Sequence, residues 1–176
     1  MKIFIICGKA RHGKDTTAEI IDKYFEKNGK KVINLQYSSY LKEYAKRITG
    51  WDGSDETKPR ELLQYLGTEF IRKEIDNLFF VKRMIGDLKV YSKYFDVATI
   101  SDARMVEEID ELKKEFSDVC AIKVVRPNFD NGLSEEQQKH ATEIALDNYD
   151  KIDQVLLNDG TVEDLEKKIE DLMEVI

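Results

Sequence analysis

The sequence has little of what marks fibrous, disulfide-rich or disordered proteins. Its 176 residues include only two prolines, two cysteines, two histidines, one tryptophan and nine glycines. So little proline and glycine excludes collagen-like chains and Pro/Gly-rich disordered chains, whereas hydrophobic residues at 41% suffice for a packed core. A chain of this length favours a single domain, because two ordinary domains would need more residues.

Long apolar runs are also absent. The longest, at residues 3–7 and 78–81, are far shorter than the roughly 18 residues that a membrane-spanning helix needs. Met1 and Lys2 lead straight into the first run, which is unlike the layout of a signal peptide. We therefore expect a cytoplasmic protein with no membrane partner.

The two cysteines, Cys7 and Cys120, lie in apolar runs that are typical of strands. No histidine or further cysteine stands at the spacing of a metal site. We therefore expect buried, reduced thiols rather than a disulfide, a metal site or a nucleophile.

The net charge of the chain is −7, from 35 acidic and 28 basic residues. Binding to nucleic acid needs an extended basic face that displaces phosphate counterions, so this excess of acid argues against a nucleic-acid partner. Against that background, four side chains that can carry positive charge lie within six positions: Lys9, Arg11, His12 and Lys14. This cluster predicts a local site for a polyanion.

Strand-like apolar runs alternate with helical segments along the chain. The expected strands are residues 2–7, 32–35, 97–101, 119–125 and 155–157. The expected helices are residues 14–27, 41–48, 59–66, 69–94, 106–116, 142–146 and 161–176, with breaks at Gly67-Thr68 and near Asn77. This alternation predicts an α/β protein with a five-stranded parallel sheet and right-handed crossovers.

Residues 8–14, GKARHGK, reproduce the GxxxxGK core of the Walker A phosphate-binding loop. The motif lies directly after an expected strand and opens an expected helix, which is the context that phosphate binding requires. Its glycines let the backbone turn N–H groups inward around phosphates. The helix N-terminus and the Lys14 ammonium would add positive charge at the β- and γ-phosphates. The sequence therefore predicts a three-layer P-loop NTPase fold that binds ATP.

The motif departs from its usual pattern at one position. Asp15 stands where Ser or Thr normally ligates Mg²⁺, and Thr16 follows it. Either the hydroxyl of Thr16 takes over that role, or Asp15 holds the ion directly or through water, which a hard cation accepts. The sequence leaves both alternatives open.

Four stretches carry a resemblance to a known family: GKDTTAEII at 13–21, KPRELLQYLGTEFIR at 58–72, SDARMVEEI at 101–109 and HATEIALDNYDKIDQVLLNDGTVEDL at 140–165. In this order they resemble the deoxynucleoside monophosphate kinases of bacteriophages and their bacterial relatives. These belong to the nucleoside monophosphate kinase group, which also includes dephospho-CoA kinase. The resemblance implies phosphoryl transfer from ATP, with Mg²⁺, to a small phosphorylated acceptor such as a (deoxy)nucleoside monophosphate. It also implies one kinase domain, 1–176, with a helical substrate-binding insertion at about 38–95 and a short lid at about 126–139.

The resemblance further implies roles for individual residues. ATP would be bound by Gly8, Ala10, Arg11, His12, Gly13, Lys14, Asp15, Thr16, Thr17, Asn158, Asp159 and Gly160. The acceptor would be bound by Lys42, Arg72, Asp102 and Arg104. Catalysis would involve Lys14, Asp102, Arg104 and Arg126, the last at the start of the lid. Mg²⁺ would be held by Asp15, Thr16 or Asp102.

Two of these residues have simpler interpretations on spacing alone. Asp102 is also placed to cap a helix that begins near Arg104, and Arg72 is also placed to pair with Glu69 on a helix surface. The position of Asp102 at the carboxyl end of the third strand favours a functional role, because ligands of open α/β sheets bind there. Arg60, Glu108 and His140 also match positions of the family, without an assigned chemistry.

Two other functions stay open. The chain is also compatible with dephospho-CoA kinase or another small-metabolite kinase that shares the phosphate loop but differs in its acceptor pocket. The absence of the usual Ser or Thr from the Walker A motif favours a third function, that of a nucleotide-binding module that transfers no phosphoryl group to an acceptor. ADP formation from ATP, measured with and without a panel of monophosphates, separates the three. The sequence does not predict the oligomeric state.

Overall fold

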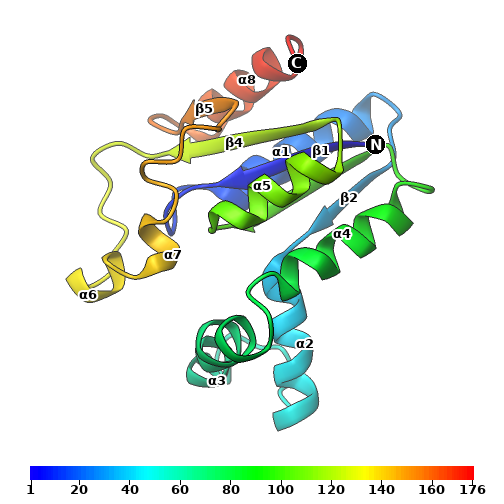
Figure 1. The fold of residues 1–176 in the computed structure, drawn as a ribbon. Coiled ribbons are helices and arrows are strands. Elements are labelled where there is room, and N and C mark those ends of the chain that lie inside the picture. The colour runs from blue at the N-terminus through cyan, green and yellow to red at the C-terminus, as the bar shows by residue number, and fades with distance from the viewer.

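A parallel sheet of five strands organises the chain, in the order β2-β3-β1-β4-β5 (Figure 1). The computed structural model describes all residues, 1–176. The strands are β1 (Lys2–Cys7), β2 (Val32–Leu35), β3 (Val97–Ala103), β4 (Val119–Val125) and β5 (Gln154–Leu157). Every neighbouring pair is parallel. The predicted α/β class and five-stranded parallel sheet are therefore confirmed.

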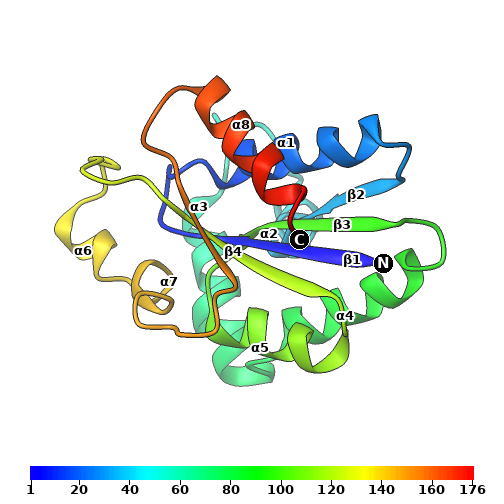
Figure 2. The same cartoon turned by 90° about the horizontal axis from the view of Figure 1, so that it is seen from above.

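The core lies on both faces of this sheet, because the central strand β1 is buried on both sides. Alternate side chains of a strand point to opposite faces. Ile3 and Ile5 pack towards α4 (Phe79–Tyr91) and α5 (Val106–Glu115), whereas Phe4 and Ile6 pack towards α1 (Lys14–Lys27) and α8 (Val162–Met173). Figure 2 shows the sheet between these two helical layers. The predicted three-layer arrangement follows from this packing.

Between β2 and β3 the chain forms a set of helices that includes α4. The others are α2 (Tyr37–Thr49), α3 (Arg60–Gln64) and the π-helix η1 (Tyr65–Ile75). In Figure 1, α2 and α3 project away from the sheet, and α4 returns to it. No helix in the chain is both long enough and apolar enough to cross a bilayer.

The predicted break at Gly67-Thr68 is wrong, because helix η1 runs through both residues. Gly67 is buried against Leu41 of α2, where an added Cβ would lie 3.0 Å from Leu41 Cδ1. The carbonyl of Gly67 also accepts a hydrogen bond from Arg72 Nη1 at 3.0 Å. Tertiary packing therefore keeps a glycine inside the helix, and the predicted break near Asn77 lies where η1 ends and α4 has not yet begun.

Two short helices follow β4, of which the sequence predicted one. Helix α7 (Ala141–Ile144) lies where residues 142–146 were expected to be helical, whereas α6 (Glu135–Gln138) falls in the segment predicted to be a lid, for which no helix was expected. Ser134 begins α6 by accepting a hydrogen bond from Gln137 N, and Gln137 Oε1 accepts one from Ser134 N. The last helix, α8, is capped by Thr161, whose Oγ1 accepts a hydrogen bond from Asp164 N at 3.2 Å.

Both cysteines are free thiols, as predicted. Cys7 is fully buried at the end of β1, and Cys120 is partly buried in β4. Burial raises the pKa of each thiol to about 11. Neither cysteine is therefore a thiolate near neutral pH, and neither is suited to act as a nucleophile.

Candidate functional site

The phosphate loop lies between β1 and α1 and needs both glycines of its motif. Gly8 and Gly13 have φ angles of 141° and 99°, which side-chain-bearing residues rarely adopt. A Cβ at Gly8 would lie 2.4 Å from the carbonyl oxygen of Val124 in β4. A Cβ at Gly13 would lie 2.6 Å from Asn158 Nδ2. The two glycines therefore let the loop pass closely beneath the end of β4 and the loop that follows β5.

The loop after β5 contains three residues that were predicted to bind ATP, and one of them contacts the phosphate loop. Asn158 Nδ2 donates a hydrogen bond to the carbonyl oxygen of His12 at 2.9 Å. Asp159 instead pairs with Lys168 of α8. Gly160 lies against Asp164, also of α8. Only Asn158 is brought into contact with the phosphate loop.

Lys14 lies at the centre of the charged residues of the site. The residue is only 8% exposed, and its ammonium donates to the carbonyl oxygen of Lys9 at 2.8 Å. Burial, followed by the positive charge of Arg104, lowers the pKa of Lys14 to about 8. The charges that oppose this shift belong to Glu143, Asp15 and Asp102. The predicted residues Asp15, Asp102 and Arg104 thus converge on the buried lysine.

Asp15 forms a cluster of oxygen ligands with two residues that the sequence analysis missed. Its Oδ1 accepts a hydrogen bond from Ser101 Oγ at 2.8 Å and lies 3.5 Å from Gln36 Nε2. Thr16 is partly exposed beside it, whereas Thr17 is fully buried and its hydroxyl lacks a hydrogen-bond partner. No group of three or more His, Cys, Asp or Glu side chains could hold a metal ion by itself. A single carboxylate is compatible with Mg²⁺, which takes one or two carboxylates and completes its coordination with water and substrate phosphates.

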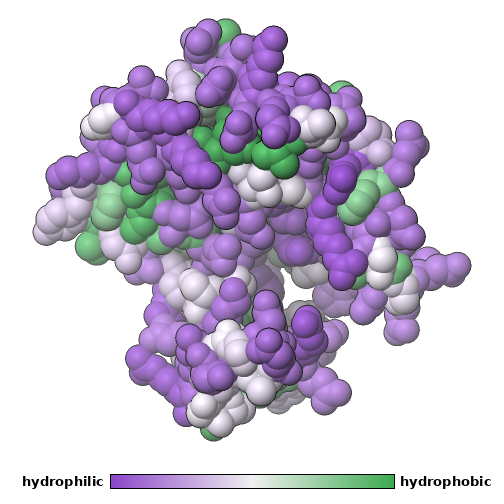
Figure 3. Space-filling view, turned by 180° about the vertical axis from the view of Figure 1, so that it is seen from behind, coloured by the Kyte–Doolittle hydropathy of each residue, from purple (hydrophilic) through white to green (hydrophobic).

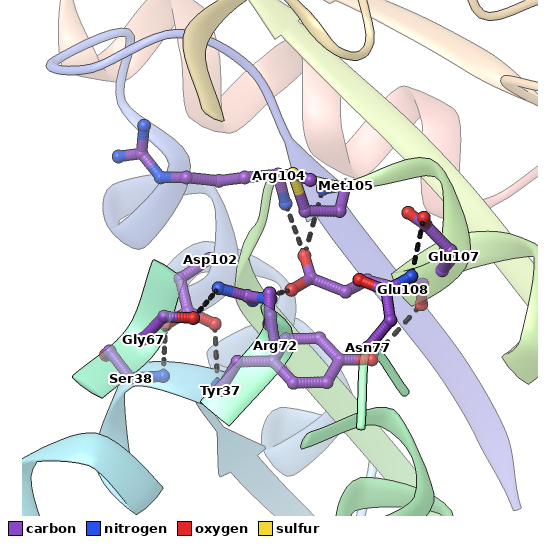
Figure 4. Close-up of polar contacts among 10 residues, drawn as sticks. All are labelled: Tyr37, Ser38, Gly67, Arg72, Asn77, Asp102, Arg104, Met105, Glu107 and Glu108. Carbon is purple, nitrogen blue, oxygen red and sulfur yellow. Dashed lines mark hydrogen bonds and ion pairs between the residues drawn. The ribbon is translucent and has the colours of Figure 1, made fainter. Parts of the chain in front are cut away.

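Asp102 caps helix α2 and not, as spacing also allowed, the helix that begins near Arg104. Its two carboxylate oxygens accept hydrogen bonds from Tyr37 N at 2.8 Å and Ser38 N at 2.9 Å (Figure 4). A carboxylate at this end of a helix also interacts favourably with the helix dipole. Asp102 therefore fixes the start of α2 against the carboxyl end of β3.

Arg72 pairs with Glu108 rather than with Glu69, as Figure 4 shows. The Nη2–Oε1 distance is 2.8 Å, and Glu69 pairs instead with Lys73. The other carboxylate oxygen of Glu108 accepts from the backbone N–H of Arg104 at 2.7 Å and of the next residue at 3.0 Å. Burial raises the pKa of Glu108, against the opposing effect of the two amides and Arg72. In the sequence, the sign of this role was the position of Glu108, a charged residue on the apolar face of helix α5.

A cavity of about 270 Å³ lies between the helices that follow β2 and the end of β3. Its walls include Tyr37, Ser38, Leu41, Leu63, Gln64, Gly67, Thr68, Arg72, Phe80, Asp102, Arg104, Glu108, His140 and Thr142. A second hollow of about 410 Å³ shares Gln64, His140 and Thr142 with it. Figure 3 shows this hollowed region on the back of the molecule. The structure thus brings Arg72, Asp102 and Arg104 to one cavity, whereas Lys42 does not line it.

The side chain of Arg104 links this cavity with the phosphate loop. In Figure 4 it extends away from the pair formed by Arg72 and Glu108. Its Nη1 forms an ion pair with Glu143 of α7. Arg104 also lines a small gap beside Gly8 and Lys9. It is therefore the predicted residue that borders both sides of the site.

The segment that follows β4 is fastened to the phosphate loop. The backbone N–H of Arg126 donates to His12 Nδ1 at 3.1 Å, and the Arg126 guanidinium lies 3.9 Å from the ring centroid of Phe129. Arg11 Nη1 donates to the carbonyl oxygen of Asn131 at 2.8 Å. The pKa of His12 is lowered, mainly by burial. Its Nδ1 therefore stays available as the acceptor of the hydrogen bond from Arg126. An open cavity of about 420 Å³ lies along this segment.

Comparisons with known proteins identify the family of the chain. Residues 22–169 match the family described as deoxynucleotide monophosphate kinase. The deoxynucleotide monophosphate kinase of Enterobacteria phage T4 is 29% identical over 153 residues, which cover 86% of this chain and 58% of that protein. The corresponding kinase of Escherichia phage RB69 is 32% identical over 115 residues, 65% of this chain and 44% of that protein. The chain thus matches only about half the length of these relatives.

Among solved structures, the APS kinase of Mycobacterium tuberculosis has a similar fold. It superposes with a TM-score of 0.58 at 12% sequence identity, covering 98% of this chain and 96% of the kinase. At so low an identity the likeness concerns the fold alone.

Proposed function

This chain belongs to the deoxynucleotide monophosphate kinase family, and from that membership we propose that it transfers the γ-phosphoryl group of ATP to a deoxynucleoside monophosphate. The observation that carries the proposal is the position of Arg104, which lines both the cavity of about 270 Å³ and the gap beside the phosphate loop. A guanidinium there would border the donor and acceptor phosphates at once. Planar, bidentate donors of this kind suit phosphate oxygens.

On the donor side, the phosphate loop and Lys14 would bind the β- and γ-phosphates. The loop offers backbone N–H groups at the start of α1, where the helix dipole favours negative charge. The buried ammonium of Lys14 adds a full charge that water does not screen well. Arg126 and Phe129 border the open cavity beside His12 and are placed to contact the rest of the nucleotide.

Mg²⁺ would be held by Asp15, with Ser101 and Gln36 orienting that carboxylate. The ion would neutralise charge on the phosphates. Thr16 stays an alternative ligand, because it follows Asp15 in α1 and is partly exposed. The carboxylates of Asp15 and Asp102 have different hydrogen-bond partners, and that of Asp102 accepts hydrogen bonds from the backbone at the start of α2.

On the acceptor side, the cavity of about 270 Å³ beside Arg104 would take the nucleoside monophosphate. Together with the hollow that it adjoins, it falls in the size range of small-molecule sites, about 300–1,000 Å³. Leu41 and Leu63 offer an apolar wall for a base, and Gln64 offers an amide that can form hydrogen bonds with it. Arg104 would bind the acceptor phosphate, while Arg72 holds the cavity wall through Glu108.

In this arrangement the protein contributes alignment and charge neutralisation rather than covalent chemistry. The helices at about 38–95 would form the acceptor side, and the segment at about 126–139 would act as the lid over the donor. Both would exclude water, which otherwise accepts the phosphoryl group. A cytoplasmic location and the lack of nucleic-acid and membrane partners stay predictions from the sequence.

The proposal is tested by the rate of ADP formation from ATP and Mg²⁺ in the presence of individual acceptors. The panel contains the four common deoxynucleoside monophosphates, the corresponding ribonucleotides, dephospho-CoA and no acceptor. The proposal predicts rapid ADP formation with at least one deoxynucleoside monophosphate and little without an acceptor. A response to dephospho-CoA alone would assign a different acceptor. An equal rate under all conditions would indicate a nucleotide-binding module that hydrolyses ATP slowly.

A further inference from the structure

A carboxylate of the protein itself occupies an anion-binding position in the site. Glu143 Oε2 accepts a hydrogen bond from the backbone N–H of Ala10, in the phosphate loop, at 3.0 Å. Its other oxygen forms an ion pair with Arg104 Nη1. The Glu143 side chain is only 8% exposed. The carboxylate therefore connects the phosphate loop to the arginine that borders the acceptor cavity.

Both partners of Glu143 are groups that bind phosphate well. The N–H groups of a phosphate loop bind phosphate oxygens, and a guanidinium binds the oxygens of carboxylate and phosphate in the same geometry. The Lys14 ammonium is close enough for the negative charge of Glu143 to raise its pKa, although it donates its hydrogen bond to Lys9 O. A carboxylate among these three groups takes the place that a phosphoryl group would take.

The surrounding contacts leave no room for a phosphate beside this carboxylate. Asp147, four residues further along, forms an ion pair with Lys9 at 3.2 Å and thus holds the same segment to the loop. The gap that remains between Gly8, Lys9, Arg104 and Glu143 is about 10 Å³. That volume accommodates about one water molecule, which is far smaller than a phosphoryl group.

We infer, on the basis of the proposed function, that Glu143 is an internal substitute for a nucleotide phosphate and has to leave its position when ATP binds. A phosphate and a carboxylate that compete for the same donors in a poorly hydrated site repel each other strongly. The segment 140–147, here named the strap, follows the proposed lid along the chain and contains only the short helix α7. When the strap moves away, Ala10 N–H and Arg104 become free for the phosphates of the two substrates.

The first test removes the charge of Glu143 and keeps its shape. Glu143→Gln loses the ion pair with Arg104 and no longer repels phosphate. We expect it to bind a non-hydrolysable ATP analogue about tenfold more tightly than the wild-type protein, which corresponds to about 1.4 kcal/mol. The matched control is Asp150→Asn, which removes the same charge from an exposed position just after the strap. Its affinity should equal that of the wild type. Unchanged or weaker binding by Glu143→Gln would overturn the inference.

The second test follows the strap directly by amide hydrogen exchange, which does not depend on catalysis. In the wild-type protein, exchange over residues 140–147 should become faster when the ATP analogue is added. In Glu143→Gln it should already be fast without the analogue. Slower exchange on addition of the analogue would overturn the inference, because the strap would then close over the nucleotide with Glu143 in place. If the wild-type protein bound no analogue, the proposed function would fail as well. Binding without strap release would contradict only the inference.

Discussion

Arg72 Nη2 lies 2.8 Å from Glu108 Oε1, and this ion pair joins helix η1 to the first turn of α5. The side chains of Arg72 and Glu108 are 18% and 4% exposed, so water screens the pair only weakly. Because Glu108 also accepts the backbone N–H of Arg104, the pair connects the cavity wall with the residue at the phosphate loop. The geometry of the proposed acceptor side thus depends on a buried carboxylate in the cavity wall.

Replacement of Arg72 should be strongly destabilising. Arg72→Ala leaves Glu108 buried without its partner, so we expect the free energy of unfolding, measured by urea denaturation, to fall by about 3 kcal/mol. The control Arg47→Ala removes an exposed pair with Glu43 and should cost less than about 1 kcal/mol. In the Arg72→Ala background, Glu108→Gln should cost less than it does alone, because the two losses are coupled. Equal small losses for Arg72→Ala and Arg47→Ala would contradict this account of the pair.

Asp102 should contribute to both stability and transfer. Asp102→Ala removes two hydrogen bonds to the start of α2 and should lower the free energy of unfolding by about 1–2 kcal/mol. The control is Thr161→Ala, which removes the cap of α8 and should cost a similar amount. We expect only Asp102→Ala to reduce the kcat of ADP formation, by more than about tenfold. An unchanged kcat would leave Asp102 as a helix cap alone.

Lys14 should destabilise the unliganded protein at neutral pH. Its pKa is about 8 in the folded chain and 10.5 as a free side chain, so the unfolded chain binds more protons between these values. Burial of the charge thus costs stability below about pH 8, and this cost disappears as the pH rises to 10.5. Lys14→Met should be more stable than the wild type by about 2–3 kcal/mol at pH 7, with a smaller difference at pH 10. Urea denaturation at the two pH values measures this, and a difference independent of pH would contradict the shifted pKa.

The metal ligand can be identified by comparing two substitutions. If Asp15 holds Mg²⁺, Asp15→Asn should raise the Mg²⁺ concentration needed for half-maximal activity, whereas Thr16→Val should change it little. A Mg²⁺ titration of ADP formation measures both. The reverse ranking would assign the ligand to Thr16. Equal tolerance of the two substitutions would mean that neither residue coordinates the ion.

Much of the fold could be predicted because its signals are local. The strands at 2–7 and 119–125 are short apolar runs bounded by turn residues, and the structure has them with these limits. The break expected at Gly67 failed because the reason for that glycine is not local. It allows Leu41 of another helix to approach and offers its carbonyl to Arg72. Helix α6 was missed because its four residues show no hydrophobic periodicity.

The site was predictable only where a motif or a resemblance marked it. The GxxxxGK pattern located the phosphate loop, and the resemblance located Arg72, Asp102 and Arg104 on the cavity that the structure contains. The contacts of these residues depend on long-range pairs that no spacing reveals. Glu108 lies 36 positions from Arg72, and Glu143 lies 133 positions from Ala10.

The most direct test of the central claim identifies the product of the reaction. The protein is incubated with ATP carrying a labelled γ-phosphate, Mg²⁺ and each deoxynucleoside monophosphate, and the labelled nucleotides are separated by chromatography. The account predicts a labelled deoxynucleoside diphosphate that forms in step with ADP, and a rate at least about a hundredfold lower for Lys14→Ala, whose fold should be intact. Labelled inorganic phosphate without any labelled diphosphate, or undiminished transfer by Lys14→Ala, would contradict it.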